Sequence, residues 1–435
     1  MKLVKILLSV FLLMTIEVRA QENDYSFNLD EFEPKAFELN GSMGVLSGFG
    51  EVQKDGDLYQ LEFLDLEPDK LESHTATLEL TGHYKSDRVS FDFLTHSEVF
   101  NDIRGQEEEN DLYEAYFGFQ TSPAFRFDLG KKSMRWGKGY TWNPVAFVER
   151  TKDAGDPELA REGYWIAATD SIFSFDHDLQ TLALTLLVLP VNEDINTDFI
   201  EAQSSQPGSK DCLIDEVTNT ELDEAEHVYL AGKLYLLYKD TDIDFMFLSA
   251  GARGPQIGMD FSRNLAPNFE IHGEWAYFAD VPHRTITDNC QSGPILIEDE
   301  IAFLLGLKYR TSNDITFIWE YYYNGRGNSK AEQQKFFQCI KDAADADDLD
   351  SLDELPISED LETGPFSRPN PMQEYMTLRA LWEEPGNVLY LSAGLQVLYN
   401  IPDESYSISP EVFYDKFKNI ELRIRTTFPK GDPLT

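Results

Sequence analysis

Along the chain from Ala36, apolar and polar positions alternate in segments of about ten residues. In residues 74–84, Ala76 and every second residue after it to Tyr84 are apolar or small, and the positions between them carry Thr, Glu or His. Successive side chains of a β-strand point to opposite faces of the sheet, so this alternation indicates a strand with one apolar and one polar face. The same pattern recurs in residues 89–93, 269–277, 315–323 and 420–428.

The length of these segments distinguishes two β architectures. A soluble β-sandwich also alternates apolar and polar positions, but its strands average about five or six residues. The segments here approach the roughly nine to eleven residues that a tilted strand needs to cross a bilayer. In a membrane β-barrel, lipid contacts the apolar face of each strand and a wet lumen contacts the polar face. The pattern therefore predicts a membrane barrel.

The connections between the predicted strands are of two kinds. Short ones cover 85–87, 122–123, 239–240, 312–313 and 384–386, and long ones cover about 98–111, 132–162, 190–226, 278–298 and 325–372. They alternate along much of the chain, which is typical of outer-membrane barrels. The predicted fold class is all-β: a transmembrane antiparallel β-barrel of about 16–18 strands with short periplasmic turns and long external loops. The count is eighteen if Leu58–Leu64 is a strand and seventeen if it is not.

The amino terminus predicts export. Lys2 and Lys5 precede an apolar run and then Val18-Arg19-Ala20, which is the pattern of a cleaved secretory signal peptide over 1–20. Residues 21–35 are acidic and contain a proline, so we expect an exposed amino-terminal arm. Residues 36–435 show no linker tract and are expected to form a single barrel domain in contact with outer-membrane lipid.

Composition excludes several classes of protein. The net charge of −42 makes nucleic acid an implausible partner, because binding to it depends on Lys and Arg. Aromatic residues make up 13% of the chain, whereas a disordered chain is expected to contain few. The sequence therefore predicts a folded, acidic, exported protein.

Candidate catalytic chemistry is sparse. The seven histidines are spread out, with no His-x-x-x-His pair, no Gly-x-Ser-x-Gly elbow and no phosphate-binding loop. We therefore expect no enzymatic activity, no cofactor and no metal site. Cys212, Cys290 and Cys339 fall in predicted long connections, and the sequence leaves open whether two of them form a disulfide. A helix is expected over Ala331–Lys341, followed by an acidic tract, Asp342–Asp353, which we interpret as a solvated external face.

A basic island stands out in this acidic chain at Gly130–Trp165. The candidate pore or constriction residues within it are Lys131, Arg135, Trp136, Lys138, Arg150, Lys152 and Arg161. One interpretation is a network of ion pairs that holds the loop together. The other is that some of these cations line a constriction, where rings of charge select small charged solutes. Both can hold at once, and in either case the loop 132–162 is expected to fold toward the pore.

Alternation also assigns basic side chains on the strands to the lumen. Lys308 and Arg310, for example, alternate with Leu305, Leu307 and Tyr309. The lumen-facing candidates are Lys308, Arg310, Arg379, Arg423 and Arg425. Together with the acidic loops, these residues predict a lumen that bears both signs of charge.

The island also carries a motif. Gly130-Lys131, then Trp136-Gly137-Lys138-Gly139 and then Asn143-Pro144 resemble the Gly-Lys, Trp-Gly-x-Gly and Asn-Pro signature of porin-type outer-membrane β-barrels of Gram-negative bacteria. The preceding LYEA, at Leu112–Ala115, resembles the strand that comes before the motif in that group. The match covers about fifty residues, and the remainder agrees only in the rhythm of its strands.

The resemblance implies an outer-membrane channel, a porin, for the passive diffusion of small hydrophilic solutes. The alternative is a barrel that does not conduct and serves as a scaffold or sheath for a periplasmic or extracellular partner such as an electron-transfer protein. A homo-oligomer and a periplasmic partner are both left open.

Overall fold

A computed structural model describes residues 36–51, 70–192, 194–197, 199, 227–251, 254–287, 290, 292–345, 370–417 and 420–431. The chain divides into two compact units, Met1–Ala36 and Phe37–Thr435, and all elements below belong to the second. The predicted signal peptide, the predicted arm and the candidate strand Leu58–Leu64 lie outside the described residues.

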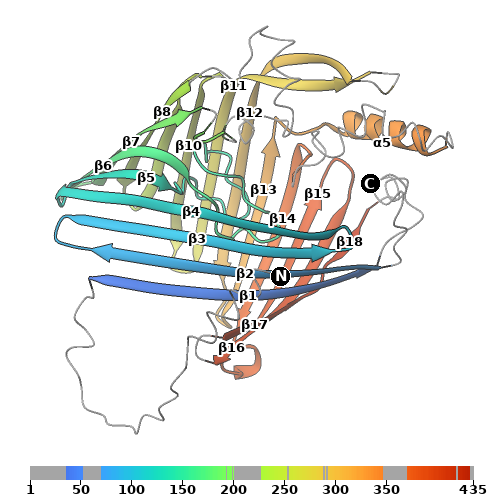
Figure 1. The fold of residues 1–435 in the computed structure, drawn as a ribbon, viewed down its shortest axis with the longest axis horizontal. Coiled ribbons are helices and arrows are strands. Elements are labelled where there is room, and N and C mark those ends of the chain that lie inside the picture. The colour runs from blue at the N-terminus through green and yellow to red at the C-terminus, as the bar shows by residue number, and fades with distance from the viewer. Residues whose placement is uncertain are drawn as a thin grey trace. The chain divides into compact units, whose positions relative to one another are not determined.

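The described residues form one sheet of eighteen strand segments, shown in Figure 1. The segments are β1 (Phe37–Glu51), β2 (Lys70–Lys85), β3 (Val89–Asp102), β4 (Gly105–Ser122), β5 (Phe125–Lys132), β6 (Tyr164–Ser174), β7 (Leu179–Val191), β8 (His227–Tyr238), β9 (Thr241–Leu248), β10 (Gln256–Ala266), β11 (Phe269–Ile286), β12 (Ser292–Arg310), β13 (Ile315–Asn324), β14 (Glu374–Glu383), β15 (Leu391–Asn400), β16 (Tyr406–Phe417), β17 (Ile420–Arg425) and β18 (Phe428–Lys430). From β1 to β17, each strand pairs antiparallel with the next in sequence. Because β18 also pairs with β16, β17 and β18 are two pieces of one last strand.

The sheet curves into the wall of a barrel. At about 4.8 Å per strand, a flat sheet would hold β5 and β13 roughly 38 Å apart. Yet Tyr140 follows the end of β5 by only eight residues, which span at most about 29 Å, and its backbone N–H lies 2.5 Å from Glu320 Oε1 on β13. The same loop also reaches β17, where Arg423 Nη1 lies 2.7 Å from Asp156 Oδ2. The sheet must therefore bend round until these strands border the same interior. The antiparallel β-barrel predicted from the alternation is confirmed.

The faces of the strands follow the alternation read from the sequence. Outward residues such as Trp275, Leu305 and Leu422 are 37%, 51% and 54% exposed. Inward residues such as Glu274 and Glu320 are 4% and 0% exposed. The apolar face of the wall therefore points out of the barrel and the polar face points inward.

Two predicted long connections are wrong. In place of a loop over 98–111, β3 runs to Asp102 and β4 begins at Gly105. In place of a loop over 278–298, β11 runs to Ile286 and β12 begins at Ser292. The extensions of β3 and β4 are rich in Glu and Asp, whereas those of β11 and β12 contain few acids and include the apolar run Ile295–Ile297. Neither pair alternates apolar and polar positions, so periodicity misses them. The ladder hydrogen bonds that hold them are made by the backbone and do not require an apolar side.

The remaining connections agree better with prediction. The connection between β5 and β6 is an irregular loop, 133–163, and the expected helix is present as α5 (Lys330–Asp345). A 3-10 turn, η4 (Pro385–Asn387), lies between β14 and β15. A disulfide joins Cys290 to Cys339, so it ties α5 to the end of the β11–β12 hairpin, while Cys212 lies outside the described residues. No helix among the described residues is long and apolar enough to cross a membrane.

Candidate functional site

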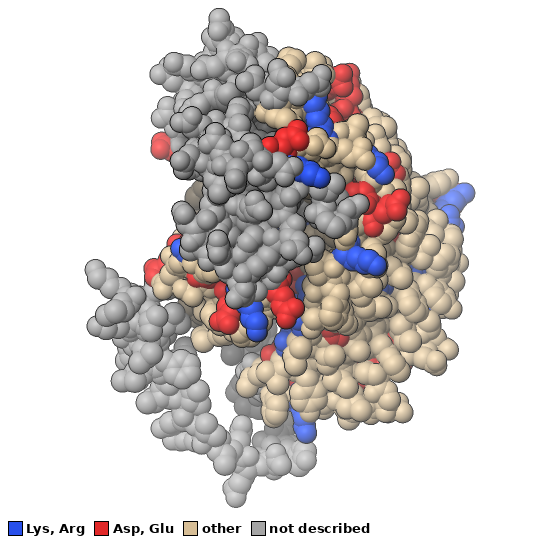
Figure 2. All heavy atoms as spheres, turned by 90° about the vertical axis from the view of Figure 1, so that its right-hand side faces the viewer, with Lys and Arg blue, Asp and Glu red and all other residues tan. Residues whose placement is uncertain are grey.

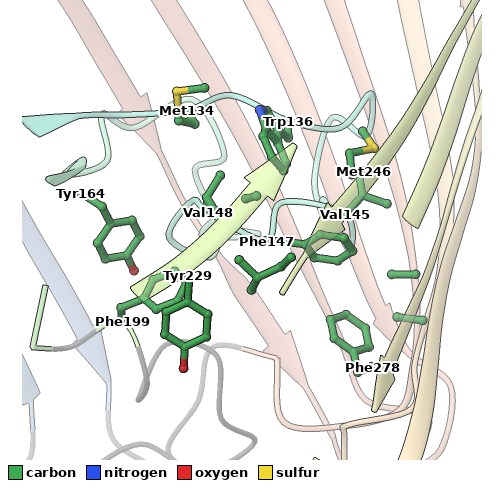
Figure 3. Packing of buried hydrophobic residues seen from close by; sticks show 14 of the residues in the cluster. Met134, Trp136, Val145, Phe147, Val148, Tyr164, Phe199, Tyr229, Met246 and Phe278 are labelled. Atoms are coloured by element: carbon green, nitrogen blue, oxygen red, sulfur yellow. The ribbon is translucent and has the colours of Figure 1, made fainter. Parts of the chain in front are cut away.

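The loop 133–163 supplies much of the hydrophobic core. Trp136, Trp142, Val145, Phe147 and Val148 are each at most 3% exposed. Figure 3 shows four of them packed beside residues of the barrel wall. The ring of Trp142 stacks on that of Tyr322 with centroids 5.2 Å apart, and the ring of Phe147 meets Phe278 edge to face at 5.9 Å. The loop therefore lies inside the barrel, packed against its inner face.

Two carboxylates of the wall hold the tip of the loop through its backbone. Glu274 Oε1 accepts the N–H groups of Lys138 and Gly139, each at 2.5 Å. Glu320 accepts the N–H groups of Tyr140 and Thr141 at 2.5 and 2.8 Å. Since a buried N–H without a partner is costly, these two side chains stabilise an otherwise irregular turn.

Gly137 explains why the motif contains glycine at this turn. Its φ is +97°, and a Cβ there would lie 2.8 Å from Glu274 Oε1. A residue with a side chain would meet both a disfavoured backbone conformation and a clash. The glycine thus allows the carboxylate to approach the backbone closely.

The loop also contains a carboxylate that organises it from within. Glu149 is 6% exposed and accepts the backbone N–H of Trp136 at 3.2 Å and the side-chain amide of Asn143 at 3.3 Å. Arg161 forms an ion pair with the same carboxylate. The Trp-Gly and Asn-Pro parts of the motif are therefore joined through one buried acid.

Most of the candidate constriction cations are engaged in such contacts. Glu162 forms ion pairs with both Lys131 and Arg150. Lys152 donates to the carbonyl oxygen of Gly139 at 2.6 Å, and burial lowers the pKa of its ammonium group.

Lys138 and Arg135 differ from each other in their surroundings. Lys138 Nζ lies 2.9 Å from Asp244 Oδ2. Burial would lower the pKa of Lys138, but the hydrogen bond to Asp244 and the nearby Asp260 outweigh burial and raise it. Arg135 is exposed, and no ion pair joins it to any other described residue. Of the seven candidates, Arg135 is thus the one whose charge faces open space, whereas Trp136 is buried.

The far side of the loop contacts the basic residues that alternation assigned to the lumen. Arg379 Nη1 lies 3.0 Å from Glu158, and Arg423 Nη1 lies 2.7 Å from Asp156. Arg425 donates to the carbonyl oxygen of Gly155 at 2.8 Å. These three arginines face inward and hold the end of the loop against β14 and β17.

The other two lumen candidates lie in different places. Lys308 Nζ is 3.2 Å from the hydroxyl of Tyr140, so it belongs to the loop site. Arg310 lies at the short-turn end of the strands, where it bonds to Asp314 at 3.0 Å and Glu383 at 2.8 Å. Its side chain is 49% exposed, and no hydrogen bond or ion pair joins it to the described residues of the loop.

A second inner surface is acidic. On β2 and β3, His96 Nδ1 lies 3.2 Å from Glu79 and His96 Nε2 lies 3.7 Å from Glu98. Strand register places further carboxylates on this face: Asp92, Glu107, Glu109, Asp111 and Glu114. We call these seven carboxylates, on β2, β3 and β4, the acidic wall. The side chains of Glu79 and Glu98 are 33% and 32% exposed, so this part of the interior remains accessible to solvent.

Sequence reasoning missed the importance of the inward carboxylates. It placed Glu274 and Glu320 on polar faces but did not identify them as acceptors for the loop, because that depends on which strands border the loop in space. A glycine-rich tract that leaves many backbone N–H groups without helix or sheet partners was the available signal. Among the described residues, no group of three or more His, Cys, Asp or Glu side chains is placed to hold a metal ion.

Comparison with known proteins finds solved structures of similar shape but no related sequence. No protein-family model matches the sequence, and no curated protein matches it. The fold is similar to that of Wzi, an outer-membrane protein involved in group 1 capsule assembly in Escherichia coli and described as a carbohydrate-binding β-barrel, with 9% identity, 91% of this chain and 80% of that chain covered, and a TM-score of 0.48.

Two further solved structures are similar to the chain at comparable sequence identity and coverage. For OccK7 (OpdD) of Pseudomonas aeruginosa the identity is 10%, the coverage is 91% of this chain and 93% of that chain, and the TM-score is 0.48. For a triple mutant of the Rhodopseudomonas blastica porin the identity is 10%, the coverage is 91% and 98%, and the TM-score is 0.39. Similarities of this size do not assign a function to this chain.

Proposed function

We propose that the protein is an outer-membrane channel through which small hydrophilic solutes diffuse passively, narrowed by the loop 133–163. The observation that carries this proposal is the loop itself, folded into the barrel and held by the inward carboxylates Glu274 and Glu320. A loop anchored across the interior reduces the free cross-section without closing the wall. We further propose that the chain is exported through cleavage of the signal peptide 1–20 and has no enzymatic activity.

The outer surface supports insertion in a membrane. Soluble monomers rarely expose contiguous apolar patches larger than a few hundred Å². Here large apolar side chains are exposed along most strands, among them Phe117, Leu129, Ile257 and Leu305. Figure 2 shows one face of the molecule on which Lys, Arg, Asp and Glu are sparse over the lower right of the view. In a membrane barrel, an outward apolar face of this kind contacts lipid acyl chains and not water.

The interior beside β1 supports a remaining passage. Every residue of β1 except Gly48 is exposed, so both faces of this strand are accessible. Among the described residues, the polar contacts of the loop lie on other strands, from Glu114 on β4 and Asp244 on β9 round to Arg423 on β17. We therefore place the proposed passage beside β1 to β3, bordered by the carboxylates of the acidic wall other than Glu114, which accepts the backbone N–H of Ser133 in the loop.

Charge favours cations along this passage. Most cations of the loop are paired with Glu149, Glu162 or Asp244, whereas the acidic wall presents carboxylates that solvent reaches. A ring or wall of carboxylates raises the local concentration of cations. We therefore propose that small cationic and neutral solutes pass more readily than anions.

The test is conductance in a planar bilayer with a salt gradient across it. Refolded mature protein, residues 21–435, should give stable open steps and a reversal potential whose sign indicates cation preference. If the protein inserts, shows strand-rich circular dichroism and conducts nothing, the channel proposal is wrong.

The dense packing of the loop favours a second candidate function, a barrel that conducts little and serves as a scaffold for a partner. Phe147 and Trp142 are buried at 1% and 3% exposure, which is the packing of a fixed core element. A sheath around an electron-transfer protein is less compatible with this interior, because it requires a wide lumen. The same bilayer recording distinguishes a scaffold from a channel.

A further inference from the structure

Three buried carboxylates stand side by side on the inner wall under the tip of the loop. Asp244 on β9 is the direct cross-strand partner of Asp260 on β10, and Asp260 is in turn the direct partner of Glu274 on β11. Their exposed fractions are 1%, 0% and 4%. Side chains at directly opposed positions have Cβ atoms about 4.5–5.5 Å apart. The two aspartates are thus neighbours in a site without access to solvent.

The groups that face this pair do not neutralise it. From the loop, Lys138 Nζ lies 2.9 Å from Asp244 and 4.0 Å from Asp260. Glu274 already accepts hydrogen bonds from backbone N–H groups of the loop and is attracted electrostatically by Lys152. One ammonium group therefore faces two aspartates.

The remaining neighbours do not supply the missing partner. On the β8 and β9 side, the hydroxyl of Tyr235 bonds to Asp242, which adds a further acid. Strand register places Lys233 on the same face of β8, but no ion pair joins it to either aspartate in the part of the chain that the structure describes. On β11, His272 faces inward beside Glu274 and is paired with Glu270 and Glu320. Among the described residues, neither oxygen of Asp260 has a hydrogen-bond partner, nor does Oδ1 of Asp244. Two adjacent carboxylates that share one counter-ion in a dry site cannot both remain ionised at low cost, and a single proton between them relieves the repulsion and fills the empty acceptors.

We propose that Asp244 and Asp260 share one proton, and that this proton latches the tip of loop 133–163 to the barrel wall. With it, Asp260 is a neutral acid that donates to Asp244, Asp244 pairs with Lys138, and the three groups together carry no net charge. Loss of the proton leaves a buried excess negative charge beside Glu274. The inference goes beyond the channel proposal, because it depends on the position of the loop and not on conduction.

Infrared spectroscopy of the intact protein in lipid tests the shared proton directly. The wild type should show the carbonyl stretch of a buried protonated carboxyl group at neutral pH. Asp260→Asn and Asp244→Asn should each remove it, because the amide then donates to the single remaining carboxylate. The matched control is Glu270→Gln on β11, which should leave the stretch unchanged. A spectrum in which neither aspartate substitution removes such a band would overturn the proposal.

Hydrogen exchange tests the latch. In the wild type, the rate of exchange at residues 138–141, corrected for the intrinsic effect of pH, should rise about tenfold at alkaline pH. The pH is kept below the range in which Lys138 itself loses its charge. Asp260→Asn should abolish this rise, since its amide hydrogen does not titrate. The same corrected pH dependence in wild type and Asp260→Asn would contradict the proposal.

The double variant Asp244→Asn/Asp260→Asn guards against misinterpretation. It leaves Lys138 without a counter-ion, so exchange at 138–141 should be fast at every pH. Exchange in β2 and β3 should match the wild type, which shows that the barrel has folded. Because neither readout involves current, a protein that conducts nothing can still confirm the latch, and a conducting protein can still refute it.

Discussion

The backbone N–H of Gly139 lies 2.5 Å from a carboxylate oxygen of Glu274, a residue 135 positions away in sequence. This contact joins the glycine-rich motif to the barrel wall. It also indicates what the Trp-Gly-x-Gly pattern does physically: it provides a backbone that can wrap closely around an inward acid.

Removal of that acid should loosen the loop. In Glu274→Ala, the buried N–H groups of Lys138 and Gly139 lose their acceptor, at a cost of about 2–5 kcal/mol. Glu274→Gln keeps one carbonyl acceptor and most of the volume, so it should cost about 1–2 kcal/mol. The measurement is the urea midpoint followed by tryptophan fluorescence, to which Trp136 and Trp142 in the loop contribute among the six tryptophans of the chain. Equal midpoints for Glu274→Ala and wild type would show that the contact does not hold the loop.

Gly137→Ala should destabilise the same turn for two reasons. The residue has a φ of +97°, and its new Cβ would meet Glu274 Oε1 at 2.8 Å. Gly386→Ala is the matched control, because Gly386 has a φ of +67° and no atom within 4 Å of an added Cβ. We expect a loss of about 1 kcal/mol for the control and about 2–4 kcal/mol for Gly137→Ala, measured by thermal unfolding. Equal losses would mean that the approach to Glu274 is not tight.

The acidic wall should set the charge preference of the passage. Glu79→Gln combined with Glu98→Gln should lower the cation-to-anion permeability ratio by about twofold per charge removed, as expected for a unit charge roughly 8 Å from the path in water that is screened by salt over a similar distance. The control is Glu108→Gln, since Glu108 lies on the opposite face of β4 from Glu107 and Glu109. The reversal potential in a salt gradient measures the ratio.

Substitution of one cation of the loop should change the charge selectivity in the opposite direction. Arg135→Glu should raise cation preference, because Arg135 is exposed. Lys138→Glu should instead disturb the fold, because Lys138 is paired with Asp244. An unchanged reversal potential in both Arg135→Glu and the acidic-wall variant would remove these groups from the account of selectivity.

Helix α5 should loosen at low pH. Burial would raise the pKa of Glu332, but hydrogen bonds from His283 and Ser329 outweigh burial and lower the pKa to about 2. The pKa in the unfolded state is near 4.5, so this stabilisation is lost as the pH falls from about 4.5 toward 2. The same hydrogen bond raises the pKa of His283, so the charged pair persists above pH 4.5 until His283 loses its proton. The contacts also form a capping box, in which Ser329 Oγ and Glu332 satisfy each other's backbone N–H groups.

Glu332→Gln provides the comparison. At neutral pH, hydrogen exchange in the first turn of α5 should be faster in the variant than in the wild type, by an amount equivalent to about 1 kcal/mol. The difference should shrink as the pH falls below about 4.5 toward 2. A difference that does not depend on pH would show that the charge of Glu332 plays no part.

Much of the wall could be predicted from the sequence because alternation has a direct physical cause. Trp275 and Leu305 are outside and Glu274 is inside because successive side chains of a strand point to opposite faces. The helix near Ala331 was predicted because its residues favour helix locally, and tertiary packing did not impose a different conformation. The sequence pattern did not predict the strand segments whose two faces are both exposed to water, at Glu107–Asn110 and Ile297–Asp299. No alternation of apolar and polar positions marks these segments.

The site could be predicted only in part. Its location in the basic island could be predicted from the sequence, because Lys and Arg are concentrated there. The pairing of Lys138 with Asp244, and of Arg161 with Glu149, could not be predicted, because it depends on which strands face the loop after the sheet has curved. The disulfide between Cys290 and Cys339 was left open for the same reason. The resemblance to the porin signature stays a prediction.

The central claim is that the loop narrows a conducting lumen. Its most direct test is the single-channel conductance of a variant in which residues 137–156 are replaced by a short flexible link, recorded beside the wild type in the same bilayer and salt. Strand-rich circular dichroism of both proteins serves as the folding control. The account predicts higher conductance for the variant. Equal conductance would contradict it, and the loop would then be a core element of the barrel and not a constriction.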